Sequence, residues 1–153
     1  MRPQDIKPDT ELCTIIGYNA QTGKSRKYFN AIMKHHKVNA TAIALNIKDD
    51  NFSFMMKNLA TSPVKKMIVE DDFQTNILDY IEKNEFKYID FVEVIDGKII
   101  GYNLDKEVED LVKDKFLDEN VKLAIKMLII ANRWYGVEID TDIVPIILYE
   151  EKI

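Results

Sequence analysis

The chain has 153 residues, of which 46% are apolar and 31% are charged, and its formal net charge is -5. This length fits one folded domain, and the apolar fraction excludes a disordered chain. Proteins that bind nucleic acids or anionic membranes are usually basic, so the acidic balance argues against both kinds of partner.

Cysteine usage and the first residues indicate the compartment. Cys13 is the one cysteine, so an intrachain disulfide is excluded. Residues 1–10 lack the apolar run of a signal peptide, and no apolar run approaches the roughly 20 residues of a membrane helix. We therefore expect a cytoplasmic protein.

Hydrophobic spacing predicts strands that alternate with helices along most of the chain. The strands are expected at 13–18, 40–47, 64–69, 88–95 and 98–102, and the helices at 25–37, 49–60, 71–83, 106–116 and 119–135. Asp96-Gly97 predicts a tight hairpin, because both turn residues accept a positive φ. The tail, 139–153, has both helical and strand features. The order predicts a single α/β domain over 1–153: a mostly parallel sheet with a terminal antiparallel hairpin and helices on both faces.

The loop from Gly17 to Ser25 resembles a phosphate-binding loop, but five residues separate its glycines where that motif has four. The extra residue changes how the backbone N–H groups curl, so an ordinary loop ending in a Ser cap is favoured over a nucleotide site. The start of the next helix still offers N–H groups beside Lys24, Arg26 and Lys27. We therefore expect a carboxylate or phosphate at Ser25.

Neither a metal nor a cofactor is expected. The side chains of His35 and His36 would point about 100° apart on a helix, which does not make a shared metal site. No two glycines are separated by a single residue, so the G-x-G-x-x-G fingerprint of dinucleotide sites is absent.

Three segments match motifs of one known family. Residues 16–30 have the length and frame of I-G-x-P-x-x-H-S-x-S-P-x-x-H-N, and residues 96–105 are similar to D-G-x-L-x-G-x-N-T-D. Residues 127–136 are similar to a late helix that ends in W-T-G. The chain thus resembles the substrate-binding domain of the shikimate dehydrogenase family. That family has a nicotinamide-binding domain where this chain has only residues 106–120, so the resemblance implies the substrate domain alone.

The resemblance also implies site residues. Ser25 matches the serine that holds the substrate carboxylate, and Asp105 matches the catalytic aspartate. Residues 67–73 lack the family's catalytic lysine, and residues 89–90 lack its substrate-binding asparagine. Lys126 stands in place of a substrate-binding glutamine, where it would pair with Asp105 or bind a ligand carboxylate. The alternative is a Lys126 that reaches solvent along a basic stripe.

We therefore expect a non-catalytic relative that binds a small (hydroxy)carboxylate in contact with Ser25 and Asp105, with Lys24 and Lys126 as further ligand-binding residues. Three alternatives stay open: the substrate half of a split dehydrogenase, with NADP supplied by a separate dinucleotide-binding protein; a divergent nucleotide-binding protein that uses the Gly23-Lys24-Ser25 turn; and an interaction module. The helix around 121–130 is apolar almost all round. It predicts either a homodimer or a cover formed by the chain's own tail.

Overall fold

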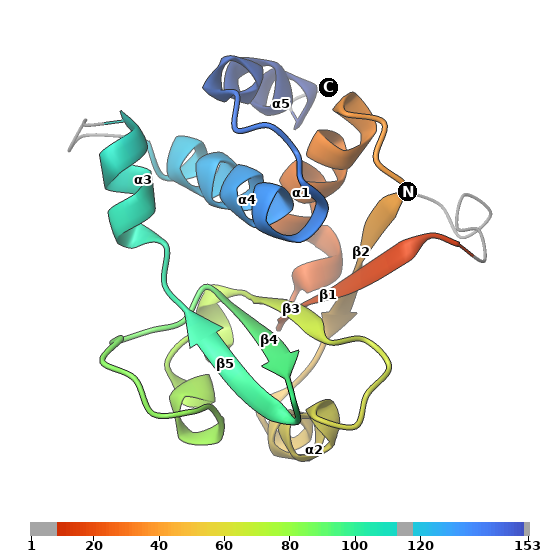
Figure 1. Cartoon of the computed structure of the whole chain (residues 1–153), viewed down its shortest axis with the longest axis vertical. Helices are drawn as coiled ribbons and strands as arrows, with labels where there is room; N and C mark the ends of the chain where they lie inside the picture. The colour runs from red at the N-terminus through yellow and green to blue at the C-terminus, as the bar shows by residue number, and fades with distance from the viewer. Residues whose placement is uncertain (1–8, 113–117, 152–153) are drawn as a thin grey trace. The chain divides into compact units, whose positions relative to one another are not determined.

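A five-stranded sheet organises the computed structural model, which describes residues 9–112 and 118–151. The strands lie in the order β2-β1-β3-β4-β5 (Figure 1). They are β1 (Glu11–Gly17), β2 (Ala40–Asn46), β3 (Lys66–Val69), β4 (Phe91–Ile95) and β5 (Lys98–Tyr102). β1 pairs with β3 in parallel, whereas β3–β4 and β4–β5 are antiparallel. The predicted α/β class, with a terminal antiparallel hairpin, is confirmed.

The chain forms two compact units. The helical unit contains Gly23–Ala42, the described residues up to Glu11 and those from Leu104 onward, and the sheet unit contains Leu12–Thr22 and Ile43–Asn103. The prediction of one domain over residues 1–153 stays a prediction.

Four helices pack together in the helical unit: α1 (Lys24–His35), α3 (Asp105–Val112), α4 (Glu119–Tyr135) and α5 (Val144–Glu151). The apolar stripe of α1 is buried, and the ring of Phe29 meets those of Trp134 and Tyr135 edge to face at 6.4 and 6.3 Å. α4 ends at Gly136, whose φ of 70° is the left-handed conformation that terminates many helices. The predicted end of α3 at 116 lies outside the described residues.

The ambiguous tail is helical, and its helix α5 packs against α4. This arrangement is the predicted cover of the apolar helix by the chain's own tail. The homodimer stays a prediction, and light scattering would test it against the 17.8 kDa mass of one chain. None of the described helices has the length and apolar character needed to cross a membrane.

The core of the sheet unit joins the strands to α2 (Asp49–Leu59). Phe52 of α2 stacks on Phe73 with ring centroids 4.5 Å apart. At the β4–β5 hairpin, Asp96 and Gly97 have φ angles of 53° and 78°, which are the positive values that the tight turn requires.

The predicted helix at 71–83 is wrong. The structure has two short 3-10 helices there, η3 (Asp71–Phe73) and η4 (Asn76–Tyr80). The main-chain groups make tertiary bonds in place of helical ones: Gln74 O accepts from Ile89 N, and Glu82 N donates to Ile99 O. These bonds to other parts of the sheet unit override the helical spacing of the apolar residues.

Candidate functional site

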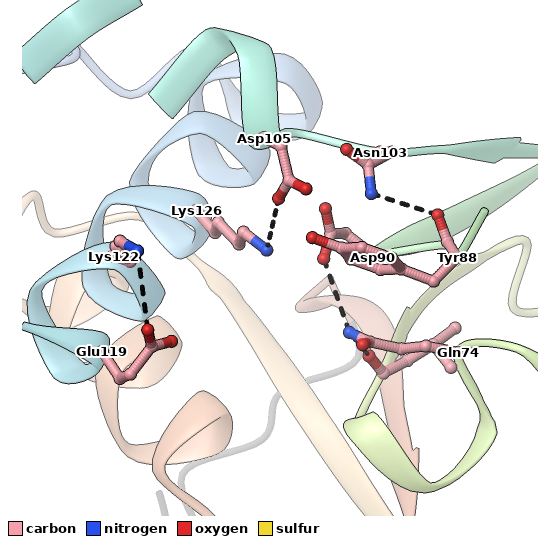
Figure 2. A network of polar contacts seen from close by, with 9 residues as sticks. Gln74, Tyr88, Asp90, Asn103, Asp105, Glu119, Lys122 and Lys126 are labelled. Atoms are coloured by element: carbon pink, nitrogen blue, oxygen red, sulfur yellow. Dashed lines mark hydrogen bonds and ion pairs between the residues drawn. The ribbon is translucent and has the colours of Figure 1, made fainter. Parts of the chain in front are cut away.

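Two of the predicted site residues meet in the helical unit. Asp105 is the first residue of α3, and Lys126 lies in the middle of α4. The Lys126 Nζ is 3.2 Å from Asp105 Oδ1 (Figure 2). The predicted pairing is confirmed, and the alternative of a Lys126 that reaches solvent is wrong. Lys122, one turn earlier on α4, instead lies 3.5 Å from Glu119.

The two partners of this ion pair differ in exposure. The Lys126 side chain is 17% exposed, and that of Asp105 is 53% exposed. A lysine that is largely buried needs an anion beside it, and Asp105 supplies one. The position of Asp105 in the first turn of α3 also favours its negative charge, because the N–H groups there carry partial positive charge. The pair thus presents a carboxylate at the surface and holds an ammonium beneath it.

The start of α1 carries Lys24 and Ser25. Gly23 occupies the N-cap, so Ser25 lies within the first turn and is not the predicted cap. Ser25 as a whole residue is only 2% exposed. Lys24 Nζ lies 3.0 Å from Asn120 Oδ1, at the start of α4. Anion binding at this end of α1 stays a prediction.

The loop before α1 does not present all its N–H groups to a ligand. Residues 20–22 form a 3-10 turn, η2 (Ala20–Thr22). The N–H of Gln21 donates to Asn46 Oδ1 at 2.9 Å, and that of Thr22 donates to Asn19 O at 3.2 Å. A phosphate-binding loop needs consecutive free N–H groups, so these two bonds weigh against the nucleotide alternative.

Tyr18 has contacts that the sequence analysis missed. Its hydroxyl lies 2.5 Å from Asp49 Oδ1, and its N–H donates to Asp72 Oδ2 at 2.8 Å. The hydrogen bond to Asp49 raises the pKa of Tyr18, with desolvation and the charges of Asp49 and Asp72 acting in the same direction. Tyr18 is 31 residues from Asp49 and 54 from Asp72, so no local pattern in the sequence indicates these contacts.

Asp90 is a buried carboxylate, and the sequence analysis did not predict its burial. It is one of the two residues, 89 and 90, near which the resemblance placed the family's asparagine, and its main chain bonds to both neighbouring strands. Gln74 Nε2 lies 3.4 Å from Asp90 Oδ1 and donates to Val69 O at 3.1 Å (Figure 2). A lone aspartate before a strand gives no sequence signal of such burial.

Several positions that carry the resemblance have a structural explanation. A Cβ on Gly17 would lie 2.8 Å from Glu70 Cβ, and a Cβ on Gly101 would lie 2.6 Å from the end of Ile81. Asn30 Oδ1 accepts the N–H of Ala42 in β2 at 3.1 Å. These residues are required by packing and by main-chain hydrogen bonding.

Asn103 has the same kind of explanation. Its Nδ2 donates to the carbonyl oxygen of Tyr88 at 3.1 Å, which ties the end of β5 to the segment that leads into β4 (Figure 2).

Among the described residues, no three His, Cys, Asp or Glu side chains gather in a way that would hold a metal ion. The rings of His35 and His36 pack edge to face at 5.1 Å.

Comparison of the sequence with known proteins finds similarity to shikimate dehydrogenases. No family model matches it. The shikimate dehydrogenase (NADP(+)) of Methanococcus maripaludis is 24% identical over 105 residues, 65% of this chain and 38% of that protein. The shikimate dehydrogenase (NADP(+)) of Aquifex aeolicus is 28% identical over 105 residues, 65% of this chain and 39% of that protein.

A solved structure gives the same result for the fold. The crystal structure of shikimate 5-dehydrogenase from Listeria monocytogenes, in complex with shikimate and NAD, matches 73% of this chain and 42% of that one. The TM-score is 0.60 at 16% identity. This chain spans less than half the length of the curated relatives that it matches. Its similarity to these shikimate dehydrogenases therefore extends over a domain-sized part of them.

Proposed function

We propose that this shikimate dehydrogenase-like domain binds a small (hydroxy)carboxylate and does not oxidise or reduce it. The observation that carries the proposal is the Lys126–Asp105 pair, which keeps a mostly buried ammonium beside an exposed carboxylate. An ammonium in such a position is suited to a carboxylate ligand, because a charged hydrogen bond gains strength where water is partly excluded. Lys24 and Ser25, at the start of α1, are the proposed second contact.

Two features of the residues weigh against redox chemistry at this site. Hydride transfer requires a bound nicotinamide, and this sequence lacks the glycine fingerprint that would bind one. Residues 67–73, which end β3 and form η3, contain no lysine to act with Asp105 as the resemblance would require. Proton transfer at a substrate hydroxyl needs both an acid and a base in place.

A split dehydrogenase is the second candidate, and the size of the match favours it. The chain covers 38–39% of relatives whose names specify NADP(+). A separate dinucleotide-binding protein would then supply both NADP and the missing part of the site. In that case shikimate oxidation would appear only when the two proteins are mixed.

Thermal-shift measurements with shikimate, quinate and ATP would test the proposal, because a ligand that binds only the folded state raises the melting temperature. We expect shikimate or quinate to raise the melting temperature of the wild type and of Lys122→Gln. Lys126→Gln should lose the shift. Lys122 makes a good control, since it carries the same charge one turn away on α4 and lies beside Glu119.

Each other outcome favours a different function. A shift with ATP alone would favour the nucleotide-binding alternative. A shift that Lys126→Gln and Lys122→Gln retain equally would remove Lys126 from the site. If none of these ligands shifts the melting temperature, the carboxylate proposal fails and the interaction module is favoured.

A further inference from the structure

We infer that the exposed face of α1 is a docking surface for an acidic polypeptide segment. Lys27, Lys34 and Lys37 form this surface, which we call the basic face, and all three are exposed. Lys27 and Lys34 lie within α1, and Lys37 follows its C-cap residue, His36. The inference goes beyond the proposed function, because none of these three lysines belongs to the proposed carboxylate site.

The charge of this segment differs from that of the whole chain. Residues 24–37 contain five lysine or arginine residues and no aspartate or glutamate, whereas the formal net charge of the chain is -5. α1 therefore has no acid of its own to pair with its lysines at i+3 or i+4. Lys27, Lys34 and Lys37 also make no ion pair or side-chain hydrogen bond with any residue that the structure describes. A partner's carboxylates would thus meet ammonium groups for which no described acid competes.

The helical period places two of these ammonium groups in one row. Lys27 and Lys34 are seven residues apart, so they lie on the same side of α1, about 10 Å from each other along its axis. Lys37 continues from the last turn, because its N–H donates to Lys34 O at 3.2 Å. An extended chain advances roughly 3.3 Å per residue, so an acidic segment of about six residues is long enough to reach all three lysines.

The backbone of Lys37 is independent evidence for the basic face. Its φ of 56° lies in the left-handed region, which side chains other than glycine adopt at a cost in strain. The residue after a helix C-cap often has this conformation, and glycine is the preferred residue there. Lysine is therefore a poorer choice than glycine for the fold itself. Strained positions are typical of residues with a functional task, and at this position the charge of Lys37 extends the basic face.

The chemistry of α1 favours an acidic polypeptide over a nucleic acid or a membrane. Single-stranded nucleic acids stack their bases on exposed aromatic rings, whereas the aromatic residues of α1, Tyr28 and Phe29, are fully buried. A helix that binds a membrane inserts its apolar face into the lipid, and the apolar face of α1 is already packed within the protein. The net negative charge of the chain also repels a polyanion more strongly than it repels a short acidic segment.

Fluorescence anisotropy with a labelled peptide of about six glutamates would test the inference. The variants are Lys27→Gln/Lys34→Gln and Lys37→Gly, and the control is Lys57→Gln/Lys106→Gln, which removes the same charge from two other exposed lysines. We expect the wild type and the control to bind the peptide equally. Lys27→Gln/Lys34→Gln should bind it roughly two- to thirtyfold more weakly, the effect of losing two exposed ion pairs. Lys37→Gly should have a higher melting temperature than the wild type and a lower affinity for the peptide.

Three results would overturn the inference. The first is equal weakening by the two double variants, which would mean that overall charge governs binding. The second is tighter binding of a single-stranded oligonucleotide, or of vesicles that contain phosphatidylserine, than of the peptide. The third is a Lys37→Gly protein that binds the peptide as tightly as the wild type does. Should Lys27→Gln/Lys34→Gln unfold, as judged by circular dichroism, the two single variants would take its place.

Discussion

Replacement of Gly17 by alanine should destabilise the protein, because the new methyl group would clash with the Cβ atom of Glu70. The added Cβ would lie 2.8 Å from Glu70 Cβ and 2.9 Å from Glu70 Cγ. Glu70 follows β3, and its N–H donates to Ile16 O at 2.9 Å, directly before the glycine. A side-chain rotation can move the Cγ but not the Cβ, so the two strands themselves would have to separate.

The magnitude follows from the size of this overlap. Carbon atoms in contact prefer a separation of roughly 3.5–4.0 Å, so the two Cβ atoms would be too close by about 0.7 Å or more. Overpacking of this kind costs about 1–3 kcal/mol, and the rigid neighbour places Gly17→Ala in the upper part of that range. Loss of backbone freedom in the unfolded chain returns about 0.4–1 kcal/mol. We therefore expect a net destabilisation of about 2 kcal/mol.

Urea denaturation followed by circular dichroism would measure the effect, and two variants of Glu70 sharpen it. Glu70→Gly removes the Cβ and should recover most of the stability of Gly17→Ala. Glu70→Ala keeps the Cβ and should recover little, so it controls for loss of the carboxylate. Gly101→Ala should cost less, because the added Cβ would meet side-chain carbons of Ile81 and Ile89, at 2.6 and 2.9 Å, and the ends of these side chains can rotate whereas a Cβ cannot. The steric account is refuted if Gly17→Ala is as stable as the wild type, or if both Glu70 variants rescue it equally.

Three further outcomes are expected. A double-mutant cycle of Asp105→Asn and Lys126→Gln should give a coupling of about 0.5–1 kcal/mol in urea denaturation, and a coupling of zero would mean that the pair does not form in solution. Tyr18 should ionise above its ordinary pKa of about 10 in an ultraviolet titration compared with Tyr18→Phe, and Asp49→Ala should lower that pKa. Because the folded-state pKa is raised, this hydrogen bond stabilises the protein below pH 10 and the effect is lost as the pH rises through the folded value. An Asp49→Ala protein with an unchanged Tyr18 titration would contradict this. Asn30→Ala should cost about 1–3 kcal/mol, because it leaves a partly buried N–H of β2 without its acceptor, and wild-type stability in urea would argue against that bond.

Local signals predicted those elements whose ends are defined by their own residues. The range predicted for α4, 119–135, agrees with the structure. Asp118 caps it by accepting the N–H of Asn120, and Gly136 terminates it. The Asp96-Gly97 turn is equally local. The segment 71–83 failed because its main chain bonds to distant residues, and hydrophobic spacing alone contains no information about such partners.

Some contacts of the candidate site were predicted before the structure and others were not. The spacing of Lys126 and Asp105 in the sequence does not predict their pairing, which followed from the resemblance to shikimate dehydrogenases. Tyr18 and Asp49 are 31 residues apart, and Gln74 and Asp90 are 16 apart. Neither pair has a sequence signature, since each depends on how strands and turns meet in the folded chain.

Some residues that match the family's motifs are explained by the fold alone, and others are not. Gly17, Asn30, Gly101 and Asn103 are accounted for by steric contact and by main-chain hydrogen bonds, so they would be needed in this fold whether or not it binds a ligand. Their similarity to the shikimate dehydrogenase motifs is therefore evidence about the fold and not about activity. The Lys126–Asp105 pair is different, because it joins a mostly buried ammonium to an exposed carboxylate, and a charge pair of this kind is weak evidence for a role in stability. The case for a carboxylate ligand accordingly depends on that pair, and the thermal shift that shikimate gives in Lys126→Gln, compared with Lys122→Gln, is the measurement that decides it.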